Sequence, residues 1–238
     1  MKILYLFILS ITVSSWGQIN NHWKLGQTDL NFTNPTPVAN VIANGNYGKA
    51  NISDVSGNLL FYTDGVKVWN KNHIIMTNGT QLLNESTANI LNTIIVPNPG
   101  NSSQYYIFTS FNPACLCIVT NPANYVYSIV EINTANPLGI VLDIGNVDTG
   151  AGITTYTKYL KDSSNTKIEN NLSYGSLTIT KNNLDNEYWL IAQSKNKLLS
   201  YKINNLGLNV IPIESNFSSN QIFSPGTQDP DTGAITGN

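Results

Sequence analysis

The sequence predicts an all-β fold, a β-propeller-like array of about three four-stranded antiparallel blades that make up an incomplete ring. Three observations predict this fold. Short runs of β-branched and aromatic residues recur along the chain, and clusters of Gly, Pro, Asn, Asp and Ser separate them. Three of these runs, beginning at Asn58, Gln104 and Glu187, also align with one another. A four-stranded unit that repeats in this way is typical of propeller blades.

The aligned runs are the predicted core strands of the repeat. They read NLLFYTD, QYYIFTS and EYWLIAQ, over residues 58–64, 104–110 and 187–193. Leu60, Tyr106 and Trp189 occupy the same place in this alignment. Each run is short and apolar at consecutive positions, which indicates a strand that is buried on both faces.

Each core strand has the same predicted neighbours. A turn precedes it, at Asp54–Gly57, Asn98–Ser103 and Lys181–Asn186. A strand precedes each turn and begins at Ala50, Thr93 and Leu177. A third strand follows and begins at Val66, Tyr125 and Lys197, and a fourth begins at His73, Gly139 and Leu208. The predicted unit is therefore a meander of four strands.

The predicted blades span residues 49–83, 92–144 and 176–213, within a partial propeller over residues 18–222. The polar residues 145–175 lengthen the second spacing and are interpreted as a loop inserted between blades. One meander cannot bury both of its faces alone, whereas meanders stacked face to face can. Three blades cannot close a ring, which usually needs about four to eight. An ordinary β-sandwich with accidental internal similarity is the alternative fold.

The two ends of the chain have interpretations of their own. Residues 1–17 contain one Lys, an apolar run from Ile3 to Val13 and then small residues, which predicts a signal peptide for export. No other run approaches the roughly 18 apolar residues of a membrane helix, so we expect no integral membrane span after signal removal. Residues 223–238 are expected to begin a truncated further blade or to form a tail. The predicted location is secreted or on the outer cell surface.

The composition argues against some classes of function. The 238 residues contain 12 Lys+Arg, all of them Lys, and 14 Asp+Glu, which gives a net charge of -2. Nucleic-acid binding is not expected, because it requires a basic surface. The guanidinium fork that clamps phosphate and carboxylate is missing as well. Charged residues make up only 11% of the chain, and amide side chains are abundant instead, with 36 Asn. We therefore expect binding through hydrogen bonds and stacking that changes little with salt.

The first predicted blade resembles a known family. Its residues include Ile52-Ser53-Asp54, GNLLFYTDG at Gly57–Gly65, Val68-Trp69-Asn70, Asn72-His73 and Asn78-Gly79, and similar segments follow at Ile94–Thr109, Tyr127–Asn133 and Asn186–Asn196. Together they resemble the N-terminal β-propeller region of exported surface proteins of gliding-type bacteria, which carry a type IX secretion or gliding-motility sorting domain. The resemblance covers most of the mature chain. It implies an exported, surface-associated protein that is not an enzyme.

Four residues are the candidates for ligand binding: Tyr62, Asp64, Trp69 and His73. Aromatic rings such as Tyr62 and Trp69 either stack on sugars or pack between blades. Asp54 and Asp64 as a pair of carboxylates could serve glycoside chemistry. However, Asp54 opens the turn DVSG and Asp64-Gly65 is a hairpin dipeptide, so each also has a local backbone role. His73 has no Ser or Cys partner in a nucleophile motif. We expect no catalytic residue, no metal and no cofactor.

Two classes of function follow from these observations. The first is an exported binding or scaffold module that acts in adhesion, through contact with a cell-surface or extracellular glycan or protein. The alternative is a secreted glycan-active enzyme built on a propeller. That enzyme needs two or more carboxylates that converge on one rim and have perturbed pKa values. Acidic residues confined to turns would favour the binding module.

Overall fold

A computed structural model describes residues 22–25, 28–31, 38–41, 48–80, 82–83, 88–113, 123–145, 156–170, 176–182, 186–194, 197–216, 227–228 and 235–236. These residues form strands, turns and bends, and none of them lies in a helix, which confirms the all-β prediction. Within these ranges there is accordingly no helix long and apolar enough to cross a bilayer. The predicted signal peptide, residues 1–17, lies outside the described residues.

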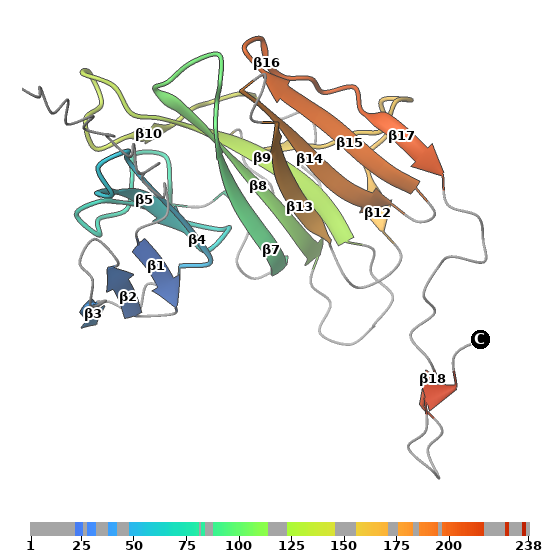
Figure 1. Ribbon diagram of the computed structural model, residues 1–238, viewed down its shortest axis with the longest axis horizontal. Coiled ribbons are helices and arrows are strands. Elements are labelled where there is room, and N and C mark those ends of the chain that lie inside the picture. Colours follow the sequence, from blue (N-terminus) through green and yellow to red (C-terminus); the bar gives the residue numbers. More distant parts are fainter. Residues whose placement is uncertain are drawn as a thin grey trace, which may run out of the picture.

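The described strands form three main antiparallel sheets and two small ones (Figure 1). An N-terminal sheet, which the sequence did not indicate, contains β1 (His22–Leu25), β2 (Thr28–Asn31) and β3 (Val38–Val41). Near the other end of the chain, β18 (Thr227–Gln228) pairs with β19 (Ile235–Thr236). The three main sheets correspond to the three predicted repeat units.

The first sheet contains β4 (Ala50–Ser53), β5 (Leu59–Thr63) and β6 (Val68–Asn70), which pair in that order. The predicted turn between β4 and β5 forms around Asp54, whose carboxylate accepts hydrogen bonds from backbone N–H groups. The predicted fourth strand does not form as a regular strand: one bridge joins Trp69 to Ile75, and further backbone hydrogen bonds join residues 74–82 to β6 and Val66. His73 stands just before this bridge with a φ of 62°, so the chain is still turning there.

The second sheet is built on three long strands, β7 (Ala88–Pro97), β8 (Gln104–Pro113) and β9 (Ala123–Glu131). The place beside β9 is filled by three short pieces instead of one fourth strand. These are β10 (Ile140–Val141), β11 (Lys158–Tyr159) and β12 (Glu169–Asn170). All three run antiparallel to β9 and follow one another along it.

This pairing differs from the interpretation of residues 145–175 as a loop between blades. Because β11 and β12 continue the edge that β10 begins, part of the segment belongs to the second sheet. The N–H of Leu160 donates to the carbonyl of Tyr125 at 2.8 Å, and the Leu160 and Ile168 side chains are buried. Because most residues of the segment are polar, the few apolar residues that pack in the core do not stand out in the sequence.

The third sheet follows the predicted meander. It contains β13 (Leu177–Asn182), β14 (Glu187–Ser194), β15 (Lys197–Asn204), β16 (Gly207–Leu208) and β17 (Ile213–Asn216). Both β16 and β17 pair with β15. The place of the fourth strand is thus divided between two pieces, and residues 210–212 leave the sheet between them.

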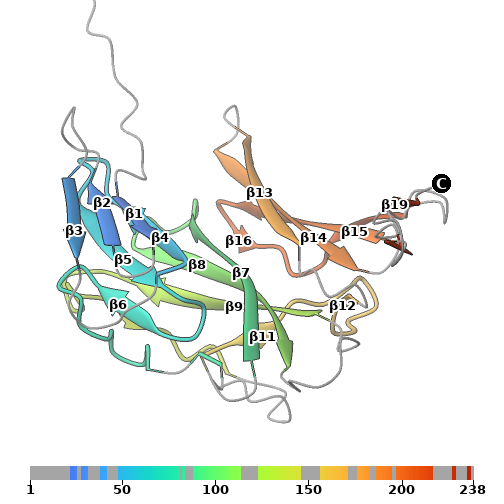
Figure 2. The same ribbon diagram turned by 90° about the horizontal axis from the view of Figure 1, so that it is seen from below.

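The three sheets stack face to face, with the second sheet in the middle (Figure 2). Successive side chains of β8 point to opposite faces, as in any strand. Phe108 packs in a buried cluster with Leu190 and Tyr201 of the third sheet. Ile107 packs in another cluster, with Phe61 of the first sheet. The second sheet is therefore buried on both faces, as its consecutive apolar residues predicted.

The aligned repeat does not preserve the direction of every side chain. Tyr106 and Trp189 both lie two residues into the second strand of their sheets. In the first sheet, the pairing of β4 with β5 skips Leu60, which is the extra residue of a β-bulge. Since a bulge shifts the alternation by one residue, Phe61 faces the second sheet while its aligned counterpart Ile107 faces the first.

Candidate functional site

The predicted aromatic residues lie together on the first sheet and are buried there. Tyr62 and Trp69 are 0% and 4% exposed, and their rings stack with centroids 5.3 Å apart. The His73 ring lies 5.8 Å from the Tyr62 ring. The structure thus brings three of the four predicted residues together. The burial of both large rings favours packing over sugar stacking.

Asp64, the fourth predicted residue, holds the turn between β5 and β6. Its Oδ1 accepts hydrogen bonds from the N–H groups of Val66 and Lys67, at 2.8 and 2.7 Å. Burial raises the pKa of this carboxyl group, and the two N–H groups counteract part of that effect. The adjacent Gly65 has a φ of 93°, as expected for a residue that must turn the chain sharply. These contacts match the local backbone role of an Asp-Gly turn.

A pocket of about 760 Å³ lies where the second and third sheets meet. One wall is β9 with residues 158–167, which include β11 and the edge loop, defined here as residues 161–167 between β11 and β12. The other wall is formed by Val210 and Ile211, which leave the third sheet between β16 and β17. Its volume falls within the roughly 300–1,000 Å³ of small-ligand pockets. The pocket therefore lies between two gaps in the strand edges: the edge loop of the second sheet, and the residues between β16 and β17 of the third sheet.

The edge loop is shaped by the Asp162 carboxylate. Its Oδ1 accepts hydrogen bonds from the N–H groups of Ser164 and Thr166, at 3.0 and 2.8 Å. Asn165 has a φ of 62°, a left-handed conformation that Asn tolerates. The turn at Asp54 repeats this arrangement, with a glycine in the left-handed place. The same local chemistry therefore gives the edge loop a defined shape.

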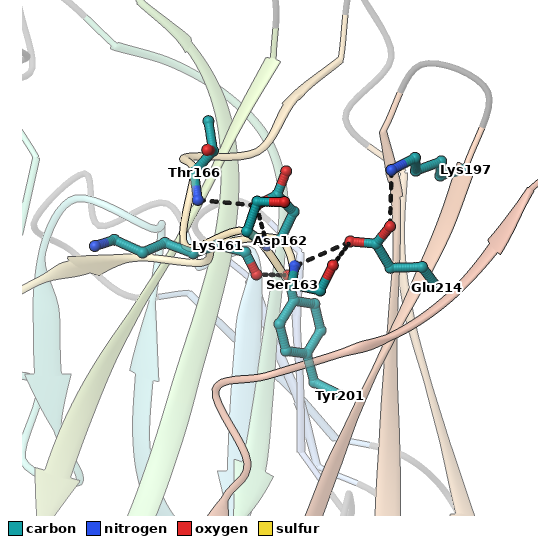
Figure 3. A network of polar contacts seen from close by, with 8 residues as sticks. Lys161, Asp162, Ser163, Thr166, Lys197, Tyr201 and Glu214 are labelled. Carbon is teal, nitrogen blue, oxygen red and sulfur yellow. Dashed lines mark hydrogen bonds and ion pairs between the residues drawn. The ribbon is translucent and has the colours of Figure 1, made fainter.

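Glu214 of β17 fixes the edge loop to the third sheet (Figure 3). Its Oε1 accepts hydrogen bonds from the backbone N–H and the Oγ of Ser163, at 2.9 and 2.7 Å. Its Oε2 lies 2.7 Å from the Lys197 Nζ. The hydrogen bond from Lys197, together with those from Ser163, lowers the pKa of Glu214 to about 2. Glu214 is therefore ionised at neutral pH and joins the two walls of the pocket.

Two buried phenols add hydrogen bonds between the same two sheets. The Tyr201 hydroxyl donates to the carbonyl of Lys161 at 2.7 Å, and the Tyr125 hydroxyl donates to the carbonyl of Gln193 at 2.6 Å. Tyr201 donates from the third sheet to the second, and Tyr125 donates from the second sheet to the third. Burial, assisted by Asp162 and Glu214, raises the pKa of Tyr201 and keeps its hydroxyl a donor.

Among the lining residues that the structure describes, three are lysines and one, Asp162, carries a carboxylate. Lys158 lies directly across from Tyr127 in the pairing of β11 with β9. Lys161 and Lys167 face each other in an antiparallel bridge. The Lys161 Nζ donates to the Asn165 side chain at 3.2 Å, and the Lys167 Nζ lies 4.8 Å from the centre of the Tyr159 ring. The lining is thus locally basic on a chain that is weakly acidic overall.

Comparisons of the chain with protein families, with curated proteins and with solved structures give no match. Among the residues that the structure describes, no three His, Cys, Asp or Glu side chains are grouped closely enough to hold a metal ion. Function is therefore inferred from the pocket and from the arrangement of the sheets.

The pocket residues were not among the candidates predicted from the sequence, although a local signal for them exists. The edge loop reads KDSSNTK, with Asp first and Asn fourth in its turn. The predicted turn DVSG has Asp first and Gly fourth. Because Asn and Gly both tolerate the left-handed conformation, the two turns carry the same signal. The contribution of Val210 and Ile211 has no such signal, since it depends on which sheet lies opposite.

Proposed function

We propose that the chain is an exported, surface-associated binding and scaffold module with the blade arrangement of a partial β-propeller. Its partner is a cell-surface or extracellular glycan or protein, and its action is adhesion without catalysis. The observation that carries this proposal is the pocket between the second and third sheets, which both sheets line and which specific hydrogen bonds hold open. The resemblance to exported surface proteins of gliding-type bacteria supports the same function.

The propeller-like arrangement is supported by contacts among the first strands of the sheets. In a propeller, first strands gather around the axis and fourth strands lie on the outside. Here β7 contacts both β4 and β13. The Asn92 side chain on β7 donates to the carbonyl of Leu177 on β13 at 3.0 Å. The pocket then lies on the outer side, where a large partner has access.

The surroundings of the carboxylates support binding more than glycoside hydrolysis. Hydrolysis needs a pair of carboxyl groups that flank the scissile bond. Asp54, Asp64 and Asp162 each accept hydrogen bonds from backbone N–H groups in their own turn. Glu187 and Glu214 pair with lysines on a neighbouring strand. These described carboxylates therefore have structural partners that account for their positions.

A glycan and surface-protein array, probed with residues 18–238, tests the proposal. Ile211→Asn changes an apolar pocket residue that is 65% exposed, so its effect on folding should be small. Leu206→Asn is the matched control, because Leu206 is 90% exposed on the same sheet and is not part of the pocket lining. We expect at least one bound partner whose signal falls in Ile211→Asn and is unchanged in Leu206→Asn.

Three results would contradict the proposal or its assignment to the pocket. An array without any bound partner would remove the binding function. Release of reducing sugar ends from a bound glycan by the unmodified chain would instead support the glycan-active enzyme. A partner that binds the two variants and the unmodified chain equally would place the binding site outside the pocket.

A further inference from the structure

We propose that the pocket binds an acidic oligosaccharide, one whose sugar units carry carboxylate or sulfate groups, and that Lys158, Lys161 and Lys167 recognise these groups. This inference rests on the proposed function, since it names the class of ligand for the same binding module. It goes beyond the proposed function because it predicts recognition of a charged ligand, whereas the average composition of the chain predicts binding without charge recognition.

The first support is the concentration of positive charge. Three of the 12 lysines of the chain belong to one pocket lining, against one carboxylate among the described lining residues. That carboxylate, Asp162, accepts two backbone N–H groups inside its own turn. The Lys161 side chain extends away from Glu214, which is occupied by Lys197 and Ser163 (Figure 3). Asp162 and Glu214, the two acidic residues that shape the loop, are thus engaged by backbone N–H groups, Ser163 and Lys197.

The second support is the cross-strand pair of lysines. Lys161 and Lys167 lie directly opposite each other in an antiparallel bridge. Like charges in this position destabilise a strand pair. The turn at Asp162 and the contacts of Glu214 nevertheless hold the edge loop in this shape. An anion bound beside this strand pair would offset the like charge of the two lysines.

The rest of the lining favours a sugar over other anions. Val210 and Ile211 are 53% and 65% exposed and present apolar surface beside the half-buried ring of Tyr127. Ser163 and Asn165 add hydroxyl and amide groups to the lining. A pyranose ring has an apolar C–H face together with hydroxyl groups, so it can use both kinds of surface. A simple inorganic anion uses neither of them.

This inference replaces the expectation of weak salt dependence for the pocket itself. The expectation follows from the average charge of the chain, but three ammonium groups in one lining form a local field that salt screens. Affinity for the acidic sugar should therefore fall as ionic strength rises. Affinity of a neutral sugar of the same size should stay nearly constant.

Calorimetric titration of residues 18–238 tests the inference with named probes. An oligogalacturonate supplies carboxylates, its methyl ester of equal length supplies the neutral match, and a sulfated oligosaccharide supplies the second type of anion. We expect the oligogalacturonate or the sulfated oligosaccharide to bind at least about tenfold more tightly than the ester. The stronger of the two identifies the anionic group that the pocket prefers.

Variants assign the binding to the pocket. Replacing all three lysines, as Lys158→Gln, Lys161→Gln and Lys167→Gln, should weaken binding of the acidic probe about tenfold or more. Lys71→Gln is the matched control, since Lys71 is exposed on the first sheet and lies outside the pocket. Unfolding curves establish that the variants fold. If the triple variant does not fold, the three single variants replace it in the test. Each of them is expected to bind the acidic probe a few-fold more weakly than the unmodified chain.

The possible failures are distinguishable. Equal binding of ester and acid, unaffected by the lysine variants, would overturn charge recognition and leave the binding module intact. Tighter binding of polyglutamate, lost in the same variants, would overturn the sugar in favour of an acidic peptide. If none of the three oligosaccharides binds, the inference is wrong. The proposed function fails as well only if the glycan and surface-protein array also shows no bound partner.

Discussion

At the scale of single residues, carboxylates shape the turns on which the rest of the molecule depends. Asp54 and Asp162 sit at the first position of equivalent turns and accept N–H groups two and four residues further along. The first turn joins two strands of the first sheet, and the second shapes a wall of the pocket. One local pattern therefore serves both the fold and the candidate site.

The role of Asp64 can be separated from catalysis by two substitutions. Burial raises its pKa above the ordinary 3.8, so the ionised carboxylate costs stability at neutral pH. Asp64→Asn keeps the Oδ1 acceptor for Val66 and Lys67 and removes the charge, so we expect unchanged or higher stability at pH 7. Asp64→Ala removes the acceptor and should lose about 1 kcal/mol. Urea unfolding measures both, and an equal loss in the two variants would disprove this role.

The pKa of Glu214 predicts how the contact between the second and third sheets depends on pH. Because its pKa is lowered from 4.5 to about 2 in the folded chain, its stabilising effect is present above 4.5 and is lost as the pH falls toward 2. Glu214→Gln should be less stable than the unmodified chain at neutral pH, and the difference should shrink in that acidic range. Urea unfolding across this range measures it. A difference that stays constant down to the lowest pH would contradict the prediction.

At the scale of elements, the turns that meet between sheets are as important as the strands. The turn between β7 and β8 approaches the turn between β15 and β16 so closely that a Cβ on Gly100 would clash with the carbonyl oxygen of Asn205. The obstacle is backbone, which cannot rotate away as a flexible side chain could. Only a residue without a side chain fits this contact.

Gly100→Ala should therefore destabilise the chain by about 1–3 kcal/mol, as overpacking typically does. Ser102→Ala is a matched control in the same turn, because Ser102 is exposed, and it should change stability by less than about 0.5 kcal/mol. Urea unfolding of the two variants gives the comparison. Equal stability of both would show that the two turns are not in contact.

The strands could be predicted because their signals are local. β5, β8 and β14 are apolar runs that follow clusters of turn residues, and each lies where these signals predicted. The pieces β11 and β12 are two residues long, which is too short for any periodic pattern. Their pairing with β9 is a contact between distant parts of the chain. The bulge at Leu60 is likewise a property of the pairing, so the alignment could not show it.

At the scale of the whole molecule, the second sheet is the structural centre. Its two faces contribute to separate buried clusters, one shared with the first sheet and one with the third. The apolar runs predicted that such faces exist, and the repeat predicted that neighbouring sheets cover them. The pocket could not be predicted in this way, because it depends on where Val210 and Ile211 meet the edge loop across the stack.

Neighbouring residues of β8 should destabilise the chain through different interfaces. Ile107 and Phe108 are 1% and 0% exposed and belong to the first–second and second–third clusters, respectively. Ile107→Ala should cost about 2–5 kcal/mol and Phe108→Ala about 3–5 kcal/mol, because each leaves a cavity in a packed interface. Urea unfolding measures both. A negligible loss in either variant would mean that the corresponding face of β8 is not covered.

The most direct test of the stacked arrangement is a nuclear Overhauser spectrum of residues 18–238 with labelled Ile methyl groups and Phe and Tyr rings. The stacking of sheets predicts cross-peaks from Ile107 to Phe61 and other side chains of the first sheet, and from Phe108 to side chains of the third sheet, including Tyr201. Cross-peaks from both residues to the same sheet, or to neither sheet, would contradict it.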